Sequence, residues 1–141
     1  IELVKLFDTK EIIALDSSYS NDLAGCECIA IVEAKTNTPT NKIRFWWYEE
    51  WMQIEYSEEA FLEDLLMYDY ANNPEIMDMY YSMSDQDRFL FAGIAEDENG
   101  NMSEILYTEP FLMSKDMCDP AEEFFSYVSQ ADNRTILTFR R

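Results

Sequence analysis

Glu59 and Glu63 are the residues whose type and spacing come closest to a catalytic or metal-binding pair, since they lie four positions apart in a helical pattern. Side chains at that spacing share one helix face, where paired carboxylates can bind metal ions or hydrolyse glycosides. Helical metal sites of this kind normally add histidine, and the chain contains none. Because 29 of the 141 residues are acidic, such pairs also occur by chance. A carboxylate-dependent hydrolase is therefore an alternative, and not the leading interpretation.

The three cysteines, Cys26, Cys28 and Cys118, could also carry chemistry. Cys26 and Cys28 are separated by one residue, which is too short for the usual paired zinc ligands. In a strand they would point to the same face. An odd number of cysteines at low density does not indicate a disulfide framework. We therefore expect Cys26 and Cys28 to be small buried side chains.

Residues 97–101 (Asp-Glu-Asn-Gly-Asn) superficially resemble the start of a calcium-binding loop. Such a loop has glycine at position 6 and a bidentate glutamate at position 12. Here Gly100 falls at position 4 and Thr108 at position 12. Asn-Gly between two apolar segments is instead a strong signal for a tight hairpin turn.

The absence of histidine excludes Ser-His-Asp and Cys-His triads, His-ligated zinc and the commonest general base at neutral pH. The three glycines stand too far apart in the sequence to form a phosphate-binding loop. We therefore predict that the protein is not an enzyme, with no catalytic residue, no metal ion and no cofactor.

The net charge of −19 is concentrated in the middle of the chain. Residues 45–114 carry 17 acids and one base, net −16, whereas residues 1–44 and 115–141 contribute −2 and −1. Neither a halophilic surface nor general solubility requires this localisation. A pI near 4.1 argues against direct binding to nucleic acid or an anionic membrane, since lysine and arginine bind those polyanions. A localised negative surface favours a cationic protein partner.

The apolar periodicity predicts a single compact α+β domain over residues 1–141, with a mostly antiparallel sheet, two consecutive central helices and one C-terminal helix. Residues 26–56 are expected to form a hairpin around a loop at 36–41. The first central helix is predicted over residues 58–70 with Ser57 as its N-cap, and the second over about 73–83. The third helix is expected to begin at Asp119-Pro120. Further strands are predicted at 1–7, 89–96, 102–111 and 135–141.

The predicted partner-binding surface combines acids of the middle segment with outward-facing Met77 and Tyr81 of the second helix. Exposed methionine and tyrosine beside carboxylates are typical of an interface. The aromatic segment 45–51 is expected to place at least two of its three tryptophans in the core. The complete predicted set is Glu49, Glu50, Glu59, Glu63, Asp64, Asp69, Met77, Asp78, Tyr81, Glu96, Asp97 and Glu98.

These features favour an acidic inhibitory protein that mimics DNA and blocks the basic groove of a nuclease, CRISPR effector, restriction enzyme or repair protein. In charge and size the chain resembles phage anti-restriction and anti-CRISPR decoys, although no motif assigns it to a family. An immunity protein that neutralises a basic toxin enzyme is the main alternative. We expect a cytoplasmic protein without a transmembrane segment, since no apolar run reaches the length of one. A removed N-terminal segment remains open, because the chain begins with Ile1.

Overall fold

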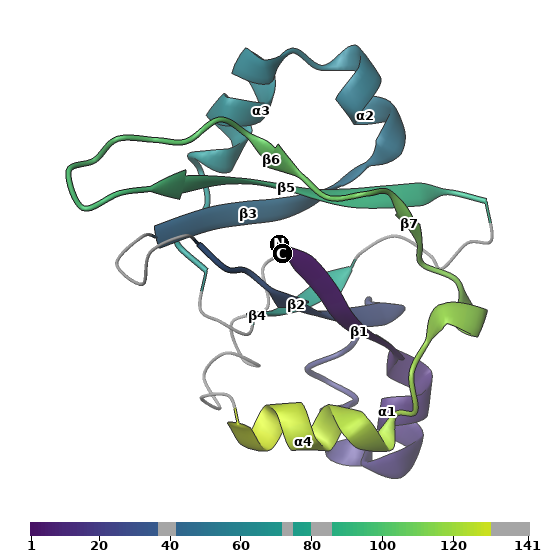
Figure 1. Ribbon diagram of the computed structural model, residues 1–141. Coiled ribbons are helices and arrows are strands. Elements are labelled where there is room, and N and C mark those ends of the chain that lie inside the picture. Colours follow the sequence, from purple (N-terminus) through teal and green to yellow (C-terminus); the bar gives the residue numbers. More distant parts are fainter. Residues whose placement is uncertain (37–41, 72–74, 80–85, 131–141) are drawn as a thin grey trace. The chain divides into compact units, whose positions relative to one another are not determined.

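The computed structural model describes residues 1–36, 42–71, 75–79 and 86–130, and these residues have an α+β architecture (Figure 1). Their strands form two antiparallel sheets. Helices α2 (Glu50–Glu55) and α3 (Glu58–Leu65) follow one another mid-chain, and α4 (Glu122–Gln130) lies near the C-terminal end. The predicted fold class is therefore confirmed.

The chain divides into two compact units. Unit 1 consists of residues 1–2, 33–73 and 86–112. Unit 2 consists of residues 3–32, 74–85 and 113–141. Unit 1 contains 16 acidic and four basic residues, net −12, whereas unit 2 contains 13 acidic and six basic residues, net −7. The acidic excess is therefore largest in unit 1.

Unit 2 is built on a sheet in the order β1-β2-β4, formed by β1 (Glu2–Asp8), β2 (Cys28–Glu33) and β4 (Glu75–Met79). Helix α1 (Thr9–Leu15) begins directly after β1, because the Asp8 carboxylate accepts a hydrogen bond from the Lys10 backbone N–H at 2.9 Å. Two short 3-10 turns are Ser17–Tyr19 and Lys115–Met117. The core collects buried apolar residues from the strands, α1, α4 and their connections: Phe7, Ile12, Leu23, Ile29, Ile31, Ile76, Ala121 and Phe124.

Unit 1 is built on β3 (Lys42–Glu49) and β5 (Arg88–Glu96), which pair antiparallel from end to end. β6 (Leu106–Tyr107) and β7 (Phe111–Leu112) also pair with β5. At Gly93 of β5, a Cβ atom would lie 2.5 Å from Ile1 Cδ1 and 2.9 Å from the Arg44 carbonyl oxygen, so this close approach requires glycine. Helices α2 and α3 follow β3 along the chain (Figure 1).

The predicted second central helix is wrong, because its described part, Glu75–Met79, forms strand β4. Ile76 and Met77 are neighbours, and both are buried, with 3% and 2% of their surface exposed. Two successive buried side chains fit a strand that is covered on both faces. A short apolar run does not distinguish strand from helix by itself, and here antiparallel pairing with β2 determines the outcome. The predicted continuation over residues 80–83 lies outside the described residues.

The predicted hairpin over residues 26–56 is also wrong. Strand β2 lies between β1 and β4, so both of its edges are occupied, whereas β3 pairs with β5 in the other sheet. The strand predicted to continue to Tyr56 ends at Glu49, and α2 follows at once. Residues 37–41 of the predicted loop lie outside the described residues.

Two local predictions in unit 1 are confirmed. The Ser57 side chain accepts a hydrogen bond from the Ala60 backbone N–H at 3.2 Å and caps α3, although α3 ends at Leu65 instead of residue 70. Asn99-Gly100 lies in the turn that follows β5, where Gly100 has a positive φ of 83°. That conformation suits glycine, which has no Cβ.

The C-terminal helix α4 begins at Glu122, later than predicted. Asp119 does not cap the helix, because it pairs with β1 instead. Its backbone N–H donates to the Leu6 carbonyl at 2.7 Å, and its carboxylate accepts the Leu6 N–H at 3.1 Å. The strand predicted over residues 135–141 lies outside the described residues.

Candidate functional site

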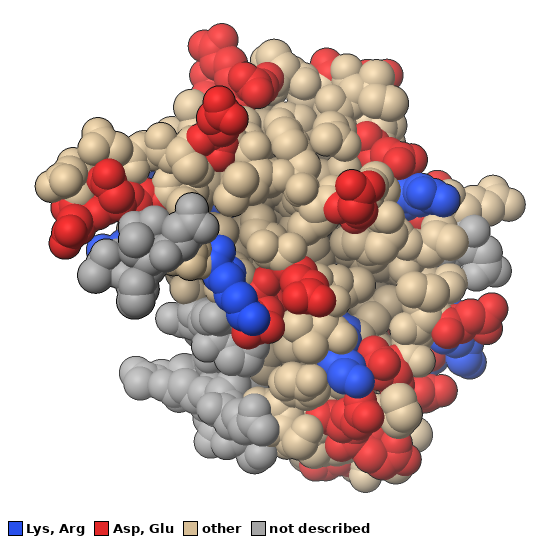
Figure 2. Space-filling view, viewed as in Figure 1, with Lys and Arg blue, Asp and Glu red and all other residues tan. Residues whose placement is uncertain are grey.

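Helix α3 presents one apolar side to the sheet of unit 1 and one acidic side to solvent. Phe61 and Leu65 lie four residues apart and are both buried. They join a core cluster with Tyr48, Leu90, Ala92 and Ile94. Glu59 and Glu63 lie four residues apart on another side of the helix, and Glu58 is its first residue. All three are exposed, and we call these three residues the α3 acidic face. Figure 2 shows acidic side chains over α3 and at the tip of the hairpin after β5.

The cations nearest to α3 in the sequence interact with an aromatic ring and a carbonyl group. The Arg44 guanidinium lies 4.4 Å from the centre of the Tyr70 ring and donates to the Leu66 carbonyl at 3.2 Å. Lys42 Nζ lies 5.0 Å from the same ring. The ion pairs found in the described part of the chain involve Lys5 and Lys35, and they do not include the α3 acidic face. The carboxylates of this face are therefore not neutralised by those cations.

The predicted acids of unit 1 divide into exposed and locally engaged residues. Glu59, Glu63, Asp69 and Glu98 are exposed, as predicted for contact residues. Asp69 lies beyond the end of α3, which was predicted to extend to residue 70. The half-buried predicted residues are Glu49, Glu50, Asp64, Glu96 and Asp97.

Three of the half-buried acids serve local structure. The Glu49 carboxylate accepts a hydrogen bond from Trp51 Nε1, and the Asp64 carboxylate accepts one from the Tyr48 hydroxyl. The Asp97 carboxylate accepts the Asn101 backbone N–H at 2.8 Å, and this hydrogen bond lowers the pKa of Asp97. Asp97 therefore organises the hairpin turn.

Of the predicted contacts in residues 77–81, the structure describes the side chain of Met77. Met77 is buried in β4, so the prediction that it faces outward was wrong. The side chain of Asp78 and all of Tyr81 lie outside the described residues.

Sequence analysis missed the exposed apolar residues at α2, because residues 50–56 were expected to continue a strand. Trp51, Ile54 and Tyr56 are all exposed. Trp47 is buried and Trp46 packs against the core, so two of the three tryptophans belong to the interior as predicted. Trp51 and Ile54 are three residues apart, so a helix predicted over residues 50–55 would have placed both side chains on one side.

Tyr48 connects the core to Asp64, and this contact gives a pH-dependent prediction. Burial raises the pKa of Tyr48, and the hydrogen bond to Asp64 raises it further. In the unfolded chain the pKa of a tyrosine is about 10. Because the pKa of Tyr48 is higher in the folded protein, its neutral hydroxyl stabilises the fold fully below a pH of about 10. This contribution to stability is lost as the pH rises from there through the pKa of the folded state. Tyr48→Phe should therefore lower the free energy of unfolding by about 1 kcal/mol near neutral pH.

Urea unfolding of both proteins across pH checks this expectation. The difference in free energy between wild type and Tyr48→Phe should shrink above a pH of about 10. A difference that stays constant through the alkaline range would contradict the assignment of a raised pKa to Tyr48.

The three cysteines, all within the described ranges, form no disulfide, and Cys26 and Cys28 are buried as predicted. Burial raises the pKa of Cys28 to about 12 and that of Cys118 to about 11. Both thiols therefore stay protonated at neutral pH, where a thiol is a weak nucleophile and a poor metal ligand. Within the described ranges, no group of three or more cysteine or acidic side chains is arranged to hold a metal ion.

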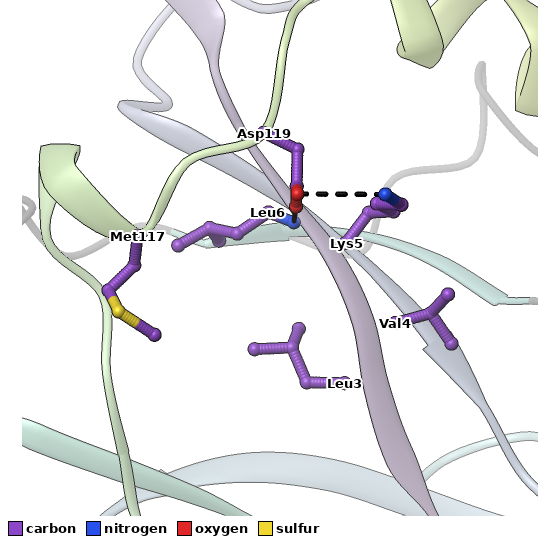
Figure 3. A pocket seen from close by; sticks show the side chains of 6 residues that line it. All are labelled: Leu3, Val4, Lys5, Leu6, Met117 and Asp119. Atoms are coloured by element: carbon purple, nitrogen blue, oxygen red, sulfur yellow. Dashed lines mark hydrogen bonds and ion pairs between the residues drawn. The ribbon is translucent and has the colours of Figure 1, made fainter.

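Unit 2 contains a shallow hollow of about 240 Å³ beside β1 (Figure 3). Its polar groups are already paired, since the Asp119 carboxylate accepts the Leu6 N–H and lies 3.6 Å from Lys5 Nζ. The volume is below the range of about 300–1,000 Å³ that is usual for small-molecule sites. The hollow therefore gives no support for a ligand or substrate site.

No family model matches the chain, and no curated protein or solved structure is detectably similar to it. None of the helices in the described ranges is long and apolar enough to cross a membrane. The exposed surface of unit 1 is therefore the feature of the molecule that can indicate a function.

Proposed function

We propose that the chain is an acidic inhibitory binding protein that mimics DNA and blocks the basic groove of a nucleic-acid-binding protein. The observation that carries this proposal is the α3 acidic face. Its carboxylates are exposed, and the nearby cations Lys42 and Arg44 are directed to Tyr70. A binding protein of this kind needs no catalytic residue, metal ion or cofactor.

The average density of charge along α3, and not a matched register, supports mimicry of a phosphate backbone. Four carboxylates lie between Glu58 and Asp64, which at about 1.5 Å per helical residue is an axial span of about 9 Å. One charge per roughly 3 Å is close to the spacing of phosphates along one DNA strand, about 3.4 Å. Since Tyr48 holds Asp64, the three residues of the α3 acidic face are the ones available to a partner.

The proposed mechanism is competition for lysine and arginine side chains. Carboxylates of α3 would occupy the cationic groups that otherwise bind phosphate, with charge-assisted hydrogen bonds replacing phosphate contacts. The rigid attachment of α3 through Phe61 and Leu65 reduces the entropy lost on binding. We place this activity in the cytoplasm, since cysteines that form no disulfide, as here, are typical of a reducing compartment.

A competition assay tests the proposal. A labelled DNA duplex is bound to each member of a panel: a nuclease, a restriction enzyme, a CRISPR effector and a DNA-repair protein. Fluorescence anisotropy should show that the chain displaces the duplex from at least one member. If the duplex stays bound to every member, DNA mimicry is refuted for these targets. Tight binding to a single toxin nuclease without displacement of DNA would favour the immunity-protein alternative.

A further inference from the structure

Helix α2 exposes an apolar cluster at its surface. Trp51 is 44% exposed, Ile54 83% and Tyr56 44%, and we call these three residues the α2 apolar cluster. Trp51 and Ile54 lie three residues apart, so they share one side of the helix. Single exposed apolar side chains are common, but three within six residues indicate a contact surface.

The aromatic members of the α2 apolar cluster are held in place. The rings of Trp51 and Tyr56 meet edge to face, with centroids 5.7 Å apart. The Tyr56 ring also lies 6.0 Å from the ring of Phe61, which is buried beneath α3. Trp51 Nε1 donates to the Glu49 carboxylate. A fixed aromatic side chain loses little entropy on binding, which is a property of interface hot spots.

Carboxylates adjoin the α2 apolar cluster along the chain. Glu55 lies between Ile54 and Tyr56, and the α3 acidic face begins two residues after Tyr56. An apolar centre beside charged groups is the usual arrangement of a protein interface, in which the rim stays polar. Exposed apolar and acidic side chains therefore follow one another directly along residues 51–63.

The charge determines which partner fits this surface. A second copy of the chain would bring a net charge of −19 and the same carboxylates against it, which is unfavourable. Nucleic acid is also negative and would be repelled. A protein with lysine or arginine around an apolar recess satisfies both the carboxylates and the apolar cluster.

We propose that the α2 apolar cluster inserts into an apolar recess within the basic groove of the inhibited protein. This inference rests on the proposed function and adds the chemistry of the partner: the groove contains an apolar socket beside its cations. Binding then has two parts, a salt-sensitive attraction through α3 and a salt-insensitive contact through α2. A DNA duplex bound in the same groove has no group that corresponds to the apolar contact made by α2.

The test uses Ile54→Ser, because Ile54 is 83% exposed and its replacement does not open the core. Leu15→Ser, at a 53% exposed leucine of α1 in unit 2, is the matched control. Affinity is measured for the panel member that the wild-type chain binds most tightly, at about 50 and about 500 mM salt. Ile54→Ser should weaken binding about tenfold at both salt concentrations, and Leu15→Ser should not weaken it.

Each outcome separates this inference from the proposed function. Salt-sensitive binding that Ile54→Ser leaves unchanged would overturn the α2 contact and retain DNA mimicry. No binding to any panel member would overturn the proposed function, and the α2 contact with it. If light scattering shows a wild-type dimer that Ile54→Ser dissociates, the cluster binds a second copy and the inference is wrong.

Discussion

Replacing Glu58, Glu59 and Glu63 together by lysine should weaken binding to a basic DNA-binding protein by about 100-fold at low salt. Each replacement removes an attraction and introduces a repulsion, and about 1 kcal/mol per site gives about 3 kcal/mol in total. Every 1.4 kcal/mol, approximately, changes affinity tenfold. Titration of the purified proteins by fluorescence anisotropy measures the effect.

A charge-matched variant shows whether position matters in addition to total charge. Glu11, Asp116 and Glu122 are exposed acids of unit 2, and their replacement by lysine changes the net charge by the same amount. We expect a loss of affinity several-fold smaller than that of the α3 variant. An equal loss in both variants would mean that net charge alone acts, and that the α3 acidic face is not the contact surface.

Because Glu58 and Glu59 lie in the first turn of α3, lysine there also opposes the helix dipole. The cost in helix stability is about 0.5 kcal/mol for each residue. Thermal unfolding of the α3 variant should therefore show a modest loss of stability and a folded protein at room temperature. Affinity is compared only at temperatures where both variants are folded.

Phe61→Ala should have the largest effect on stability, a loss of about 3–5 kcal/mol in the free energy of unfolding. Phe61 is buried, and its ring lies 5.0 Å from the ring of Tyr48 and 5.5 Å from that of Tyr107. The substitution leaves a cavity between α3 and the sheet, so the helix and its carboxylates lose their support.

Urea unfolding of wild type and Phe61→Ala measures this loss, with Leu66→Ala as the control. Leu66 follows α3 and is partly exposed, so its truncation should cost less than about 1 kcal/mol. Equal losses in the two variants would contradict the role of Phe61 as the anchor of α3.

Local signals predicted those parts of the fold that local hydrogen bonds determine. Ser57 caps α3 through the backbone three residues later, and Asn99-Gly100 turns the chain between β5 and its partner strands. Both depend on interactions within a few residues, so the sequence pattern contains the necessary information.

Long-range pairing could not be predicted in the same way. Whether Glu75–Met79 is a strand depends on β2, which lies more than 40 residues earlier in the chain. The assignment of Met77 to an exposed surface failed for this reason. The engagement of Asp64 likewise depends on Tyr48, which lies 16 positions away on another element.

The exposure of Glu59 and Glu63 was predicted correctly, because charged side chains in an acidic segment stay in contact with water. The candidate site was missed at α2, where apolar residues are exposed against the usual tendency to bury them. Trp51 and Ile54 were expected in a strand, because aromatic and β-branched residues favour strands. An exposed apolar cluster on a short helix contradicts both expectations, and only the structure identifies it.

The salt dependence of binding tests most directly whether α3 acts as a substitute for a phosphate backbone. Affinity for the tightest-binding panel member is measured between about 50 and about 500 mM salt. If carboxylates of unit 1 contact lysine and arginine, the wild-type affinity should fall at least about tenfold over this range. The fall should be clearly smaller for the triple lysine variant of Glu58, Glu59 and Glu63. An affinity that stays constant across the salt range would contradict DNA mimicry by this protein.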